Sequence, residues 1–119
     1  MTEHRPRYQH LSWDAVPSDA PMPGAERRMI VGDGLMICRL KFDAGIVTPV
    51  HRHVHEQMTL VERGRARFSI EGAERIAGPG DVLHFASGIL HGATMLDEEV
   101  VLMDIFTPIR EDFLPAKTP

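Results

Sequence analysis

The sequence contains a single cysteine, Cys38, among its 119 residues. One thiol excludes an intramolecular disulfide framework, and it excludes a zinc site built from several cysteines. The apolar neighbours Ile37 and Leu40 predict that Cys38 is a small buried side chain without a chemical role. The cysteine content therefore indicates neither a cross-linked nor a cysteine-ligated fold.

The sequence also lacks a long apolar run and an excess of basic residues. No stretch approaches the ~20 apolar residues that a membrane helix needs, and the first residues, MTEHRPRYQHLSWD, contain no signal-peptide core. The 13 basic and 17 acidic residues give a formal net charge of -4, which offers no reason to expect nucleic acid as a partner. We expect a cytoplasmic protein that binds neither membrane nor nucleic acid.

The length and the hydrophobic content of 43% are ordinary for one domain with its own core. Residues 1–24 hold four of the nine prolines and show no sustained periodicity, so we expect an N-terminal arm there. A barrel is expected over residues 25–114 and a tail over residues 115–119. The arm could cover a sheet edge of a second copy of the chain.

Short strand-like segments separated by turns follow the arm. Turn residues recur about every 8–12 residues, which is typical of an all-β sandwich or barrel. Residues 36–42 alternate apolar and basic side chains, which predicts a half-buried strand, and residues 100–106 are apolar on both faces, which predicts a central strand. Thr107 and Pro108 are typical of a helix start, so one short helical turn is expected near the C-terminus.

A dense group of potential metal ligands, HRHVHEQ, occupies residues 51–57. In one straight strand His51 and Gln57 would lie ~20 Å apart, too far to share an ion whose ligands sit ~2.0–2.2 Å from it. His51 and His53 can converge, because alternate residues of a strand share a face. A further ligand from this segment requires the chain to bend near Val54 and His55.

Another ligand has to come from a distant part of the chain. The segment GDVLHFASGILHGATM contains two histidines. His91 follows a glycine-containing turn and is available for this role. His84 lies within a strand-like run and equally fits a surface or a core position.

These residues resemble the two motifs of the cupin superfamily. The matching positions are Gly45, His51, His53, Gln57 and Gly64 in the first motif, and Gly80, Gly88 and His91 in the second. Gln57 replaces the usual glutamate, Ala86 replaces the usual proline, and Met95 stands where asparagine is common. The resemblance implies a double-stranded β-helix, the jelly-roll barrel of the cupins, with a metal inside. It also implies a homodimer that pairs through sheet edges.

The same resemblance implies that the metal ligands are His51, His53, Gln57 and His91. We expect one divalent ion, for which zinc, nickel, manganese and iron all fit. Three imidazoles and an amide carry no charge, so the ion would keep its full positive charge. This favours Lewis-acid chemistry over stabilisation of a higher oxidation state.

The segments HVHEQ and DIFTPIREDFL are similar to KdgF-type cupins of pectin and alginate breakdown, which convert an unsaturated uronate into its open-chain keto form. This resemblance implies catalytic roles for Asp104, Phe106 and Arg110. From the residues alone, Asp104 either has a pKa raised by burial and transfers protons, or pairs with an arginine or caps a turn. Phe106 either stacks on a sugar or fills the core. Arg110 either binds a uronate carboxylate or is exposed.

We therefore expect a metal-dependent, non-redox enzyme that acts on a small sugar acid and converts an unsaturated uronate to its linear ketone. Two alternatives remain open at this point. One is a metal-dependent dioxygenase, which would consume oxygen, and the other is a barrel that binds a sugar or another small molecule without catalysis. The sequence assigns no role to His55 or Glu56.

Overall fold

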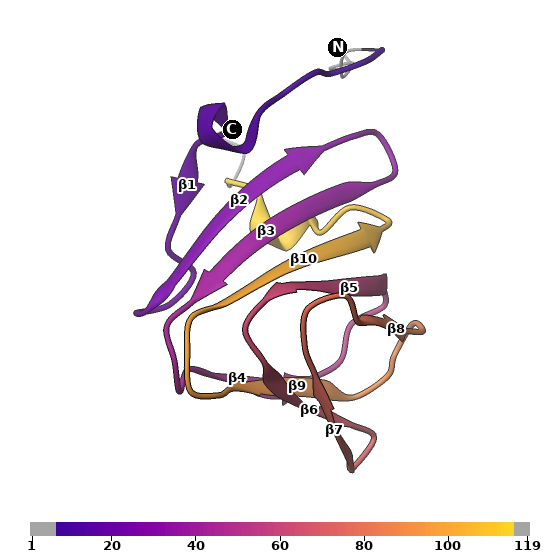
Figure 1. Cartoon of the computed structure of the whole chain (residues 1–119). Helices are drawn as coiled ribbons and strands as arrows, with labels where there is room; N and C mark the ends of the chain where they lie inside the picture. Colours follow the sequence, from indigo (N-terminus) through magenta and orange to yellow (C-terminus); the bar gives the residue numbers. More distant parts are fainter. Residues whose placement is uncertain (1–6, 116–119) are drawn as a thin grey trace.

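The computed structural model describes residues 7–115, which form two antiparallel β-sheets that face each other (Figure 1). The six-stranded sheet has the order β1 (Ser18–Asp19), β2 (Ala25–Val31), β3 (Met36–Phe42), β10 (Val100–Thr107), β5 (Glu56–Arg63) and β8 (Val82–Phe85). The four-stranded sheet has the order β4 (Val47–His51), β9 (His91–Met95), β6 (Ala66–Ile70) and β7 (Ala73–Ala77). The predicted all-β architecture is confirmed.

The two strands with the clearest sequence patterns form as predicted. In β3 the apolar positions are buried and the positions between them are half-buried. Strand β10 lies between β3 and β5, and its first residues are buried on both faces. Cys38 in β3 is fully buried, and burial raises the pKa of its thiol to about 12. The thiol therefore stays protonated at neutral pH and has no reactive form.

The sheets enclose an apolar core, whose largest fully buried side chains include Phe85, Met36 and Met95. The first-motif glycine Gly64 forms the turn from β5 to β6 with a φ of 74°. A β-carbon at this position would collide with the backbone carbonyl of Glu99. Glycine is required here both for the left-handed backbone and for the close approach of the two segments.

Two short 3-10 helices flank the barrel strands, η1 (Trp13–Ala15) and η2 (Glu111–Phe113). A C-terminal helical turn is therefore present, but its predicted start at Thr107 and Pro108 is wrong. Thr107 is the last residue of β10, where it pairs with Glu56 of β5, so the chain is still extended at this point. The turn begins at Glu111 instead.

The predicted arm, barrel and tail are only partly within the described structure, because residues 1–6 and 116–119 lie outside it. In the described part of the arm, β1 pairs with β2 and forms one edge of the larger sheet. The division at residues 24 and 114 stays a prediction. Within residues 7–115 no helix has the length and apolarity to cross a membrane.

Candidate metal centre

The chain bends between the first two histidines and Gln57, as the distance argument requires. Strand β4 ends at His51 and β5 begins at Glu56, and residues 52–55 between them belong to no strand. His51 lies opposite His91 at the start of β9, because β4 and β9 are neighbours in the smaller sheet. The bend thus brings the first motif and the distant histidine to one place.

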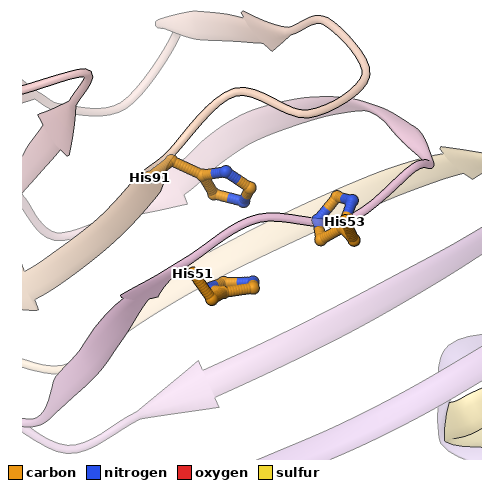
Figure 2. Close-up of side chains that lie close together, drawn as sticks. All are labelled: His51, His53 and His91. Carbon is orange, nitrogen blue, oxygen red and sulfur yellow. The ribbon is translucent and has the colours of Figure 1, made fainter.

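The rings of His51, His53 and His91 face a common point (Figure 2). Each histidine offers one ring nitrogen, and these three nitrogens all lie within 4.8 Å of one another. The ring centroids are 4.6 Å apart for His51 and His91 and 5.0 Å apart for His53 and His91. The three side chains are positioned to bind one metal ion.

Hydrogen bonds determine which nitrogen of each ring is free. The Nδ1 atoms of His51, His53 and His91 lie 3.0, 3.0 and 2.8 Å from backbone carbonyl oxygens of Pro49, His55 and Ile89. A carbonyl oxygen only accepts, so each Nδ1 carries a hydrogen, and in the neutral form of the ring Nε2 then carries a lone pair. The Nε2 of His91 is buried without a hydrogen-bond partner in the described structure. This donor set fits a divalent transition-metal ion.

The protonation state of the histidines also suits a metal. Burial, together with the nearby Arg110 and His91, lowers the pKa of His53 to about 4. Burial likewise lowers the pKa of His91 from its ordinary value. Both rings are therefore neutral at pH 7, the form in which an imidazole binds a metal.

Gln57 presents its amide oxygen to the histidines, 3.1 Å from Nε2 of His53. Its amide nitrogen donates to the hydroxyl of Thr59 at 2.8 Å, and that hydroxyl donates its only hydrogen to Oδ1 of Asp104 at 2.6 Å. Since Nδ1 of His53 carries the ring hydrogen, two lone-pair acceptors face each other across the 3.1 Å contact. A cation beside both atoms would satisfy them, which supports Gln57 as a fourth ligand.

Replacing Thr59 with valine should therefore weaken metal binding. Valine keeps the shape but removes the hydroxyl that fixes the orientation of the Gln57 amide. Loss of such a supporting partner typically costs about 10- to 100-fold in metal affinity. Competition with a chromophoric chelator measures the effect, and Thr59→Ser, which keeps the hydroxyl, is the matched control. Unchanged affinity in the valine variant would contradict this orienting role.

A cavity of about 330 Å³ is lined by two of the three histidines, His51 and His91. Its wall includes His51, His91, Gln57, Asp104 and Phe106, and it also includes the guanidinium-bearing residues Arg27 and Arg110. All residues predicted to act in catalysis thus line the same space as three of the four candidate metal ligands. A small molecule bound there would contact both groups of residues.

Asp104 is half-buried in the cavity wall, and its pKa is raised to about 6 by burial. Hydrogen bonds from Thr59 and Gln57 and the charge of Arg110 oppose this effect and are smaller. The predicted direction of the pKa is therefore confirmed. Among the ion pairs of the described residues none includes Asp104, so the alternative of an arginine partner is wrong.

Phe106 and Arg110 lie beside the candidate ligands. The ring of Phe106 is buried and packs edge-on against His53, with centroids 5.8 Å apart. Arg110 is buried, so of its two alternatives the exposed side chain is wrong, and it forms a bidentate ion pair with Asp112. Its guanidinium lies 5.1 Å from the centroid of Phe106.

The remaining polar residues of the first motif lie outside the histidine group. Glu56 and His84 form an exposed pair with Oε2 and Nε2 2.6 Å apart. This places His84 on the surface and away from the candidate ligands. The ring of His55 lies 5.3 Å from that of His53, and its backbone carbonyl accepts the hydrogen bond from His53.

Two supporting residues were not identified from the sequence. Phe85 stacks on His91 with centroids 4.5 Å apart and an interplanar angle of 9°, which holds the imidazole in place. Thr59 orients Gln57 as described above. The alternation of β5 contains a signal for Thr59, because Gln57 and Thr59 share one face of the strand.

Comparisons with known proteins agree with this geometry. Residues 39–106 match the Cupin domain family. The pectin degradation protein KdgF of Dickeya dadantii (strain 3937) is 35% identical over 103 residues, which cover 85% of this chain and 94% of that protein.

Two solved structures share the fold over nearly the whole chain. An RmlC-like cupin from Shewanella frigidimarina NCIMB 400 superimposes with a TM-score of 0.83 at 28% identity, covering 90% of this chain and 97% of that one. KdgF from Halomonas sp. superimposes with a TM-score of 0.80 at 32% identity, covering 85% and 95%. The predicted jelly-roll barrel is confirmed, and the chain belongs to the cupin family.

Proposed function

We propose that this protein is a metal-dependent enzyme of pectin or alginate breakdown, which converts an unsaturated uronate into its linear ketone. The observation that carries the proposal is the common cavity, whose wall includes His51, His91, Gln57 and the half-buried Asp104, beside the group of ring nitrogens that His53 completes. The similarity of this chain to a protein named for pectin degradation also supports the proposal. The proposed ligands are His51, His53, Gln57 and His91.

The charges around the cavity favour an anionic substrate. The charged side chains of the cavity wall, apart from the histidines, are Arg27, Arg110 and Asp104. A bound divalent ion would add two positive charges, so the wall would be positive even with Asp104 ionised. Such a cavity attracts a carboxylate and disfavours a cationic ligand. A uronate supplies one carboxylate and a ring that fits beside Phe106.

The proposed reaction moves protons and breaks one ring bond without oxidation. The bound ion would supply Lewis acidity toward a hydroxyl or ring oxygen of the sugar. The hemiacetal hydroxyl loses its proton as its carbon becomes an aldehyde, and the bond from that carbon to the ring oxygen breaks. The ring oxygen leaves as an enolate oxygen and becomes the ketone oxygen when the other carbon of the double bond gains a proton. Atoms and electrons balance within the sugar.

Asp104 is the proposed proton carrier. With a pKa of about 6, its carboxyl group is present in both forms near neutral pH, so it can accept a proton and return it. Its Oδ1 already accepts the hydroxyl of Thr59, which leaves Oδ2 for the substrate. Phe106 supports the sugar ring, and Arg110 binds the carboxylate through donors that Asp112 does not use.

The metal-loaded protein should accelerate the loss of the ultraviolet absorbance of an unsaturated uronate produced by a polysaccharide lyase. A chelator should return the rate to the spontaneous value, and oxygen should not be consumed, because the reaction is an isomerisation. A rate equal to the spontaneous one would contradict the proposal and favour the alternative of a barrel that binds a small molecule without catalysis. Oxygen uptake in step with substrate loss would identify a dioxygenase instead.

A homodimer in the cytoplasm stays part of the proposal. The two-residue strand β1 forms one edge of the larger sheet. Among residues 7–115 only β2 pairs with this strand, and the free backbone groups of an edge strand are suited to pairing with a second copy.

A further inference from the structure

A second guanidinium group, that of Arg27, belongs to the same cavity as Arg110. Arg27 lies in β2, opposite Leu40 of β3, and Leu40 also lines the cavity. Residues opposite each other in an antiparallel pair share a face of the sheet. The side chain of Arg27 is therefore on the inner face of the sheet, although it comes from a part of the chain far from the motifs.

The two arginines are held in the same manner. Arg27 donates from Nε and Nη2 to both oxygens of Asp19, at 3.1 and 2.8 Å. Arg110 donates from Nε and Nη2 to both oxygens of Asp112, at 3.0 and 2.7 Å. The guanidinium carbons lie 4.4 Å (Arg27) and 4.1 Å (Arg110) from the ring centroid of Phe113. Both guanidinium groups thus contact the ring of Phe113.

The charges of these two ion pairs are unequally distributed between the cavity and the solvent. The side chains of Arg27 and Arg110 are only 11% and 10% exposed, and both line the cavity. Asp19 and Asp112 are 50% and 57% exposed and are not part of the cavity wall. Water screens the two carboxylates, so the cavity side of each pair is positive.

Each guanidinium also keeps hydrogen-bond donors that the protein does not use. A guanidinium has five N–H groups, of which two are used by its aspartate. Within the described residues neither Nη1 atom makes a hydrogen bond. Neither atom is among the fully buried polar atoms that lack a partner, so both remain accessible. Free, positively charged donors at a cavity wall are suited to an acceptor-only group such as a carboxylate.

We propose that Arg27 and Arg110 together form the subsite for the carboxylate of a sugar acid, with Arg27 as a binding residue equal in importance to Arg110. This inference rests on the proposed substrate class and extends it, because it fixes which end of the sugar faces η2. The carboxylate lies between the two arginines, and the rest of the ring extends toward Asp104 and the histidines.

Binding of two saturated sugars tests the subsite without any turnover. Isothermal titration of the zinc-loaded protein compares D-galacturonate with D-galactose, which lacks the carboxylate. In Arg27→Met, galacturonate affinity should fall about 10- to 100-fold, the effect of one charge-assisted hydrogen-bonding partner. Galactose affinity should stay unchanged. Arg27→Lys, which keeps the charge but not the planar fork, should lie between the wild type and the methionine variant.

Two controls separate binding from a structural role. Arg39→Met makes the same change on β3, where Arg39 pairs with Glu62 and does not line the cavity, and it should leave both affinities unchanged. Asp19→Asn keeps Arg27 but removes the ion pair to β1. If Asp19→Asn weakens galacturonate binding as much as Arg27→Met does, Arg27 acts by holding β1 and the subsite is wrong.

The remaining outcomes distinguish the subsite from the proposed reaction. Wild-type affinity of Arg27→Met for galacturonate overturns the subsite, whatever the turnover assay shows. Equal binding of galacturonate and galactose by the wild type overturns the carboxylate specificity. Selective loss of galacturonate binding in Arg27→Met, without turnover of the unsaturated uronate by the wild type, supports the subsite and rejects only the reaction.

Discussion

Replacing His91 with alanine is expected to lower metal affinity by at least about 100-fold and to abolish turnover. Even a residue that only supports a metal ligand changes affinity by about 10- to 100-fold, and a ligand contributes more. His91 is the most buried of the three histidines, and its Nε2 has no hydrogen-bond partner in the described structure. Metal content after dialysis and competition with a chelator measure the loss.

The matched control for this change is His84→Ala. His84 is an exposed histidine whose described partner is Glu56, and it lies outside the cluster of three ring nitrogens. Its removal should leave metal affinity and turnover at the wild-type level, because one exposed pair contributes little to stability. If His91→Ala retained its metal while His84→Ala lost it, the metal centre would lie at the exposed pair instead.

The bend at the metal centre could be predicted because it follows from a local distance. The two ends of a straight seven-residue strand lie too far apart to bind the same ion, so a break in the strand between His53 and Gln57 was required. The structure places the break at residues 52–55, between β4 and β5. The strands at residues 36–42 and 100–106 were likewise visible in local patterns of apolar and polar side chains.

Contacts that depend on sheet register could not be predicted in this way. Thr59 meets Asp104 because they are opposite each other in the pairing of β5 with β10. The start of η2 was misplaced for the same reason, since pairing with Glu56 keeps Thr107 in a strand. Arg27 belongs to neither motif, and its approach to Phe113 depends on how β2 and the C-terminal turn η2 pack against each other.

Replacing Asp104 with asparagine is expected to lower turnover of the unsaturated uronate by about 100- to 10,000-fold, the usual contribution of a general acid or base. The amide oxygen can still accept the hydroxyl of Thr59, so Gln57 should stay oriented and metal affinity should change little. Asp97→Asn, at an exposed residue between β9 and β10, is the matched control and should retain full activity. Full activity of Asp104→Asn would exclude Asp104 as the proton carrier.

The same substitution should make the metal-free protein more stable at pH 7. Burial raises the pKa of Asp104 from 3.8 to about 6, so the folded state binds this proton more tightly than the unfolded state. The stability that the protonated carboxyl group of Asp104 contributes to the fold is therefore fully present below pH 4 and is lost as the pH rises through 6. One unit of pKa difference is worth about 1.4 kcal/mol, so the ionised carboxylate destabilises the fold by roughly 3 kcal/mol at most.

Urea denaturation of the two metal-free proteins measures this difference. At pH 7 the asparagine variant should unfold with a free energy higher by about 2–3 kcal/mol, and the advantage should shrink toward zero below about pH 3, where the wild-type carboxyl is protonated in both states. A variant that is less stable than the wild type at pH 7 would mean that the ionised carboxylate stabilises the fold. The expected combination, lower turnover with higher stability, is characteristic of a residue retained for catalysis at the expense of the fold.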